Sequence, residues 1–250
     1  MDVLGMTRHA DTRMPGLPIE YVSNDREGAA ELVVLMPAAL AAGRHDRTLT
    51  HFHRWSWHQE WPEALVISIA DPAMKQSTAL DGAWFIHPEL DVLRGISALV
   101  QEIAVAARVA NDRIVFYGSS LGGFGAIACA AHVPGARAVA EVPQIHFENW
   151  QAQATKVVED HILGGPVSAL RDHAPERLSL TSRLEVAGLI PPLKLVTNEY
   201  DRSIRDQRDF IDWCGSVALP RIGRQTLVIS DLVRGHKVLP KDDIVPLVSA

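Results

Sequence analysis

The chain has 250 residues, a length that suits one large domain around a single hydrophobic core. Hydrophobic residues make up 47% of it and charged residues 22%, as in ordinary globular proteins. The formal net charge of −6 argues against a nucleic-acid partner, because binding to polyanions usually requires clustered lysine and arginine.

The N-terminal segment, MDVLGMTRHADTRM, lacks the apolar stretch of a secretory signal. The most apolar long segment, residues 96–110, is interrupted by Gln101, Glu102 and Arg108, so it does not predict a membrane span. We therefore expect a soluble, cytoplasmic protein without a membrane partner. The sequence leaves its oligomeric state open.

Six apolar runs bounded by turn-forming residues predict β-strands. Val, Ile and Leu fill these runs almost continuously, which is typical of parallel strands covered on both faces. Helical spacing of apolar residues predicts helices from Leu93 to Ala107, from the motif at 118–125 to Ala131, and from Ile204 to Cys214. This alternation predicts an α/β fold with a doubly wound, mostly parallel sheet. The predicted strands are residues 32–36, 64–70, 113–117, 137–142, 193–197 and 226–230.

A long segment, residues 146–190, separates two of the predicted strands and exceeds what a crossover connection needs. Its sequence indicates short helices that end at Gly and Pro. We therefore expect one domain, residues 1–250, with a small helical cap inserted at about 146–190. In open α/β sheets, an insertion after the carboxyl end of a strand lies over the crevice where ligands bind.

Residues 113–125, RIVFYGSSLGGFG, carry the motif G-x-S-x-G with Ser120 at its centre. At such a nucleophile elbow the serine occupies a strained turn between strand and helix, and its hydroxyl projects above the sheet. Gly118 and Gly122 remove the Cβ atoms that would collide where strand and helix pack most closely. The motif also fits a turn that only lets the helix pack. A phosphate-binding loop is disfavoured, because neither G-x-G-x-x-G nor Gly-Lys-Ser/Thr is present.

In this motif, its strand and helix context and the order of its elements, the sequence resembles the α/β-hydrolase superfamily over nearly its whole length. Members of the superfamily carry a catalytic triad in the chain order nucleophile, acid, histidine. In this chain, Asp201 follows the strand at 193–197 and His236 follows the strand at 226–230. We therefore expect Ser120 to attack the substrate, His236 to take its proton and Asp201 to orient His236.

These assignments have alternatives. Glu199 or Asp231 could supply the carboxylate instead, and Asp201 could instead cap the helix that begins near Ser203. His146, which also follows a predicted strand, is the second candidate for the base and a candidate substrate-binding residue.

The oxyanion hole is expected to use the backbone N–H of Leu121, the residue after the nucleophile. The second donor usually comes from the loop after an early strand, where many relatives have His-Gly. This chain has Met36-Pro37-Ala38-Ala39 there. Because Pro37 has no N–H, Ala38 or Ala39 would have to donate.

Residues 51–61, HFHRWSWHQEW, are rich in histidine and tryptophan. His51, His53 and His58 could suggest a metal site, but no Cys or carboxylate joins them at a recognised zinc spacing. We therefore expect no metal and no cofactor. The segment is expected to cover the sheet or to line an acyl or sugar pocket.

Two further expectations concern single side chains. Trp150, at the start of the predicted cap, is a candidate substrate-facing residue, because binding sites favour aromatic linings. The two cysteines, Cys129 and Cys214, are expected to be small buried side chains.

A narrower resemblance is to a loosely defined bacterial group of α/β hydrolases, some linked to glycan export or surface polysaccharide loci. It rests on residues 67–74, 117–130, 141–150 and 191–201. The leading hypothesis is a serine hydrolase that cleaves a small-molecule ester or thioester, which the narrower resemblance allows to be carbohydrate-linked. The alternatives are an acyltransferase with the same triad and a non-catalytic binding or export-accessory protein on a hydrolase fold.

Overall fold

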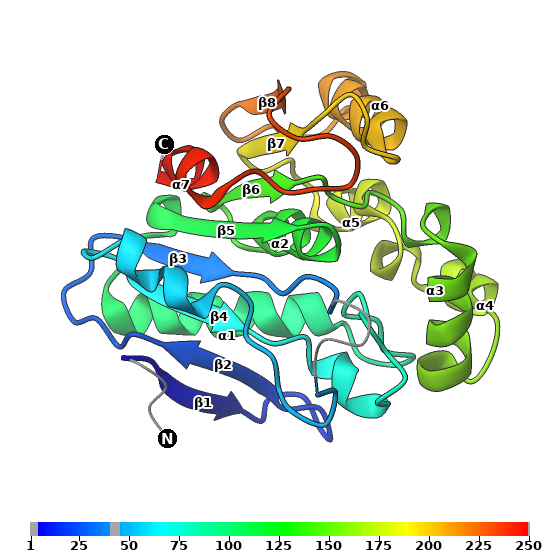
Figure 1. Ribbon diagram of the computed structural model, residues 1–250, viewed down its shortest axis with the longest axis horizontal. Coiled ribbons are helices and arrows are strands. Elements are labelled where there is room, and N and C mark those ends of the chain that lie inside the picture. The colour runs from blue at the N-terminus through cyan, green and yellow to red at the C-terminus, as the bar shows by residue number, and fades with distance from the viewer. Residues whose placement is uncertain (1–4, 41–45, 250) are drawn as a thin grey trace.

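A single twisted sheet of eight strands forms the centre of the molecule (Figure 1). The computed structural model describes residues 5–40 and 46–249. The strand order across the sheet is β1-β2-β4-β3-β5-β6-β7-β8. The strands are β1 Thr7–Asp11, β2 Ile19–Ser23, β3 Leu32–Leu35, β4 Leu65–Ile69, β5 Ile114–Ser119, β6 Arg137–Glu141, β7 Leu193–Thr197 and β8 Gln225–Ile229.

The last six strands, β3 to β8, are parallel to one another, and each coincides with a strand predicted from the apolar runs. The predicted α/β fold with a mostly parallel sheet is therefore confirmed. The structure adds an antiparallel pair, β1 and β2, at one edge. The sequence did not reveal β1 because its residues alternate between partly and fully exposed positions and include Arg8, His9 and Asp11.

Helices cover both faces of the sheet. Side chains alternate along each strand, so Val34 faces one core and its neighbour Val33 faces the other. The larger core packs against α1, α2, α5 and α6, and the smaller one against α7 and the tryptophan-rich segment. Figure 1 shows α7 in front of the sheet and α1 and α2 behind it. These helices are α1 Val92–Ala107, α2 Leu121–His132, α5 Leu180–Ala187, α6 Ile204–Ser216 and α7 Lys241–Ser249.

The long segment between β6 and β7 is helical, and its parts differ in position. Helix α5 packs against α2 and so acts as the ordinary crossover between the two strands. Two short helices, α3 Ala152–Val158 and α4 Val167–His173, precede it. In Figure 1 they lie on the right, beyond the ends toward which the parallel strands point.

Two further features of the structure are the burial of the cysteines and the hydrophobic length of the helices. Cys129 and Cys214 are both buried, as expected, and burial raises the pKa of each thiol to about 12. In the described ranges, every helix is too short or too polar to span a bilayer.

Candidate active site

Ser120 lies between the last residue of β5 and the first residue of α2 and is partly exposed. Its backbone has φ 55° and ψ −121°, a conformation that costs free energy for a residue with a side chain. The elbow is tight enough to require glycine on both sides. A Cβ at Gly118 would lie 2.2 Å from the carbonyl oxygen of Gly122, and a Cβ at Gly122 would lie 2.3 Å from that of Pro37.

The structure brings Ser120, His236 and Asp201 together. The Oγ of Ser120 is 2.8 Å from Nε2 of His236, and Nδ1 of His236 is 2.8 Å from Oδ2 of Asp201. The Asp201 side chain is 0% exposed, whereas the His236 side chain is 18% exposed. The buried carboxylate can thus orient the ring while the ring edge beside Ser120 stays open to a substrate.

Backbone and amide groups hold the acid and the histidine loop in place. Oδ1 of Asp201 accepts hydrogen bonds from the backbone N–H of Ser203 at 2.8 Å and from Nε2 of Gln207 at 3.2 Å. The buried Asn198 joins the two loops, because its amide donates to the carbonyl of Gly235 at 2.8 Å and accepts from the Gly235 N–H at 3.1 Å. Asp201 is not the cap of α6, because the N-cap position is Ser203; the contact of Asp201 with the Ser203 N–H belongs to the turn before the helix.

The alternative residues lie elsewhere. Glu199 is exposed and forms an ion pair with Arg208 at 2.5 Å, and Asp231 is exposed on the surface. His146 forms an isolated β-bridge with Ser179 in the segment that leads to α5, and burial lowers its pKa. The imidazole beside Ser120 is that of His236.

Gln144 is a residue of the site that sequence reasoning did not single out. Its Nε2 donates to Oγ of Ser120 at 3.0 Å, and its Oε1 accepts from the indole N–H of Trp84. An indole N–H can only donate, so the carbonyl oxygen of the Gln144 amide must face Trp84. The NH₂ group of the same amide therefore faces Ser120. The only sequence signal is the Pro-Gln pair directly after a buried strand, and that pair has no chemistry of its own.

Glu141, the last residue of β6, supports the histidine loop from below. Its Oε1 accepts from the backbone N–H of Leu239 at 2.9 Å, and its Oε2 accepts from the hydroxyl of Tyr117. Burial raises the pKa of this carboxyl. The adjacent Arg54 donates to Ser119 Oγ at 2.7 Å and stacks on Tyr117, so the second serine of the elbow is tied to the structure beneath it.

The expected oxyanion donors lie on the β3 side of Ser120. Leu121 opens α2, where the first N–H groups have no partner within the helix. Leu121, Pro37 and Ala38 all line one cavity, whereas Ala39 is exposed. The placement of Ala38 therefore suits a second donor better than that of Ala39.

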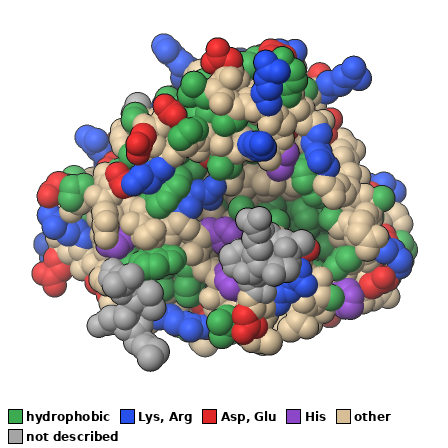
Figure 2. Space-filling model, in the orientation of Figure 1, with side chains coloured by type: hydrophobic (Ala, Val, Ile, Leu, Met, Phe, Trp, Pro, Cys, Tyr) green, Lys and Arg blue, Asp and Glu red, His purple; other side chains and the backbone are tan. Residues whose placement is uncertain are grey.

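That cavity has a volume of about 600 Å³ and extends from the elbow across the carboxyl ends of β3 and β4. Four residues with hydroxyl side chains are part of its lining, Thr48, Thr50, Ser77 and Thr78, among a larger number of apolar residues. Charged groups gather at its far end, where Glu20 binds both Arg8 and Lys75. Figure 2 shows histidine side chains near the middle of this face of the molecule.

Some residues of the segment at 51–61 line the cavity, and others pack in the core. His51 and His53 line the cavity, while Trp61 is buried in the smaller core and Trp57 stacks on Tyr117. In the two described ranges, no three His, Cys, Asp or Glu side chains gather closely enough to hold a metal ion.

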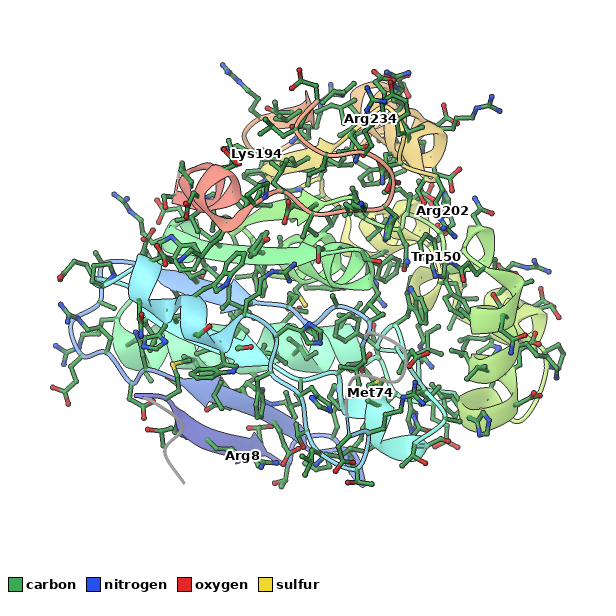
Figure 3. All side chains as sticks on the ribbon, in the orientation of Figure 1. Arg8, Met74, Trp150, Lys194, Arg202 and Arg234 are labelled. Atoms are coloured by element: carbon green, nitrogen blue, oxygen red, sulfur yellow. The ribbon has the colours of Figure 1, made fainter. Side chains whose placement is uncertain are left out.

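Trp150 lies against the ring of His236. Its ring centroid is 4.6 Å from that of His236, and the guanidinium of Arg202 lies 5.0 Å from the Trp150 ring. Figure 3 shows Trp150 and Arg202 side by side at the edge nearest to α3. Trp150 therefore connects the helical insertion to the centre of the site.

Comparison with known proteins gives structural likeness only. No protein-family model and no curated protein matches the sequence. The fold is similar to that of a capsule O-acetyltransferase of Neisseria meningitidis serogroup A, with a TM-score of 0.67 and 14% identity over 95% of this chain and 90% of that one. It is similar to an S-formylglutathione hydrolase from Staphylococcus aureus, with a TM-score of 0.55 and 14% identity over 93% and 92%.

A third similar structure is a glycosylation-associated protein (Gap123) complex from Streptococcus agalactiae, with a TM-score of 0.61 and 16% identity. The match covers 91% of this chain but only 43% of that longer chain. These likenesses, together with the parallel sheet and the elbow, show that the chain has the α/β-hydrolase fold.

Proposed function

We propose that this chain is a serine hydrolase that cleaves an ester or thioester through an acyl-enzyme. One observation carries the proposal: Oγ of Ser120, the imidazole of His236 and the carboxylate of Asp201 form a continuous chain of 2.8 Å contacts at an elbow. A serine hydroxyl becomes an effective nucleophile when an imidazole takes its proton, and the imidazole does so when a carboxylate holds it.

Acylation begins when Ser120 Oγ attacks the carbonyl carbon of the substrate and its proton passes to Nε2 of His236. Negative charge then develops on the former carbonyl oxygen. The backbone N–H groups of Leu121 and Ala38, both at the cavity wall, would donate to that oxygen. His236 next gives its proton to the leaving oxygen or sulfur, the bond between it and the acyl carbon breaks, and the acyl group stays on Ser120.

Deacylation repeats these steps with water as the nucleophile. Water gives its proton to Nε2 of His236 as it attacks the acyl carbon, and the proton then returns to Ser120 Oγ when the acid leaves. Every group that these steps use belongs to the chain itself. We include in the proposal that α3 and α4 act as a cap. His161, in the π-helical segment Glu159–Leu163 that continues α3, contacts Ser77 at the cavity with 3.2 Å between Nδ1 and Oγ.

A second candidate function is acyl transfer to a hydroxyl group of a carbohydrate. The lining of the cavity beside Ser120 includes hydroxyl and charged side chains, which can bind the hydroxyls of a sugar, and a similar fold occurs in a capsule O-acetyltransferase. The first half of the reaction is the same, and the outcome depends on whether water or an alcohol reaches the acyl-enzyme. Product analysis with added sugars separates the two.

The test is labelling of the purified protein with a fluorophosphonate probe, which reacts with activated serines. We expect wild type to be labelled at one site and Ser120→Ala to lose the label, because Ser120 is the hydroxyl in contact with an imidazole. Release of 4-nitrophenol from short-chain 4-nitrophenyl esters should disappear in the same variant.

The matched control is Ser119→Ala, which removes the neighbouring hydroxyl of the elbow. Ser119 binds Arg54 rather than His236, so labelling of this variant should persist. Circular dichroism establishes that both variants are folded. A folded wild type that takes no label and hydrolyses no ester or thioester would favour the non-catalytic hypothesis.

A further inference from the structure

Two arginines flank the histidine loop with their guanidinium groups on aromatic rings. The guanidinium of Arg202 lies 5.0 Å from the ring centre of Trp150, and that of Arg234 lies 4.5 Å from the ring centre of Tyr200. Both arginines are exposed, and the Tyr200 side chain is largely exposed as well. Arg202 follows Asp201 directly, and Arg234 precedes His236 by two residues. We call these two arginines the rim arginines.

Neither rim arginine is neutralised. Within residues 5–40 and 46–249, neither forms an ion pair with a carboxylate, and each has an aromatic ring as its partner. Their neighbour Arg208 differs, because Glu199 binds it at 2.5 Å. Stacking on an aromatic face holds a guanidinium in place and leaves its N–H groups free to donate. The rim therefore presents oriented positive charge in a protein whose formal net charge is −6.

The position of the rim arginines indicates which part of the substrate they would contact. In acylation, the imidazole protonates the leaving group, so the leaving group must lie beside His236. The ring of Trp150 contacts that imidazole at 4.6 Å between centroids, and Arg202 lies on Trp150. The acyl oxygen turns the other way, toward Leu121 and Ala38. Figure 3 shows Arg202 beside Trp150 at the right of the molecule and Arg234 above them, at the top.

We propose that the rim arginines bind an anionic group, a carboxylate or a phosphate, on the alcohol or thiol part of the substrate. In acyl transfer the same position would bind an anionic acceptor. Guanidinium groups match the geometry of both carboxylates and phosphates, since their N–H groups donate in parallel pairs. This inference rests on the proposed function, because it uses the roles assigned there to His236 and the oxyanion donors.

The kinetic test compares a negatively charged acetyl ester, 4-acetoxybenzoate, with its neutral methyl ester. Because the two esters differ in leaving-group reactivity as well as in charge, the ratio of their kcat/KM values is compared between variants. Arg202→Gln should lower the ratio of kcat/KM for the anionic ester to that for the neutral one by about two- to fivefold. Arg202→Lys should restore part of that ratio, and the double variant with Arg234→Gln should lose more of it. The ratio of wild type should fall as sodium chloride is added, because salt screens exposed charges.

Arg208→Gln is the matched control, since it removes an exposed, ion-paired arginine from the same region. It should leave the ratio unchanged. An Arg202→Gln variant with the wild-type ratio, or a wild-type ratio that does not change as salt is added, would overturn the inference. The proposed function would survive that outcome, because it needs only that the neutral ester be cleaved and Ser120 be labelled.

A binding measurement tests the rim without turnover. Benzoate and phenyl phosphate are titrated into the Ser120→Ala variant and followed by NMR shifts, with benzamide as the neutral control. We expect both anions to bind more tightly than benzamide and to lose that advantage when Arg202 is also replaced by Gln. The tighter of the two anions identifies the class of group, and equal binding of anions and benzamide would contradict the inference even if labelling succeeds.

Discussion

The hydroxyl of Ser120 accepts a hydrogen bond from Gln144 in addition to its contact with His236. In the proposed reaction, a donor aimed at this oxygen has opposite effects on acylation and deacylation. It withdraws electron density from the attacking oxygen in acylation. In deacylation the same oxygen leaves with developing negative charge, and the donor stabilises that charge. Gln144 should therefore favour turnover of the acyl-enzyme over its formation.

Replacement of Gln144 by Ala tests this asymmetry. Loss of one hydrogen bond to a developing charge should slow deacylation about tenfold, while acylation should change less or become faster. The measurement is a stopped-flow burst with 4-nitrophenyl acetate, in which the fast phase reports acylation and the steady phase deacylation. Gln101→Ala, a glutamine of α1 on the surface, serves as the control. Equal slowing of both phases would argue that Gln144 only supports the fold.

At the residue scale, the sequence predicted the residues that the structure brings together as Ser120, Asp201 and His236, because each follows a strand that could be recognised by itself. It could not predict Gln144. The orientation of that amide depends on Trp84, which lies 60 positions away in the chain and reaches it only in the folded structure. The sequence also left Ala38 and Ala39 open as the second oxyanion donor, and only the folded structure shows that Ala38 lines the cavity.

At the scale of elements, the elbow joins β5, α2 and the loop after β3 through contacts that only glycine allows. Gly122→Ala would place a Cβ 2.3 Å from the carbonyl oxygen of Pro37, so the loop that carries Ala38 would have to move. We expect the free energy of unfolding to fall by about 1–3 kcal/mol and kcat to fall on the order of 100-fold. Urea unfolding and ester hydrolysis measure the two effects.

Gly215→Ala provides the control, because Gly215 also lies in a helix, α6, and has open space where its Cβ would be. Alanine there should raise the free energy of unfolding by up to about 1 kcal/mol through helix propensity. If Gly122→Ala behaved like Gly215→Ala, the loop after β3 would not be constrained by the elbow.

The elements that the sequence revealed are those with continuous or helically spaced apolar residues. Strands β3 to β8 and helices α1, α2 and α6 belong to this group. The pair β1 and β2 and the helix α7 do not, because each buries only a few side chains. In α7 these are Ile244 and Val248, and Pro246 interrupts the helical pattern. Their positions are set by packing against the finished sheet rather than by a local signal.

At the scale of the whole molecule, the stability of the fold should depend on pH through Asp71. This residue follows β4, accepts backbone N–H groups of Ala73 and Phe85, and is buried, and its burial raises the pKa to about 6 from the ordinary value of 3.8. The folded state thus binds this proton more tightly than the unfolded state. The associated stability is present below the unfolded pKa and is lost as the pH rises toward 6.

The comparison of wild type with Asp71→Asn isolates that contribution. The difference in free energy of unfolding, wild type minus variant, should fall by about 2 kcal/mol between about pH 4 and pH 7. Urea denaturation at several pH values measures it, since most other titrating groups contribute equally to both proteins. A difference that stays constant or rises with pH would contradict the raised pKa.

The unusual backbone of Ser120 has a further consequence for the molecule as a whole. Ser120 has a positive φ, which costs free energy for a residue with a side chain. The residues packed around the elbow hold it in this strained conformation. Glycine at this position would relieve the backbone strain and raise the thermal stability of the protein. The same substitution would remove the Ser120 hydroxyl. Under the proposed function, thermal stability and catalysis would therefore favour different residues at this position.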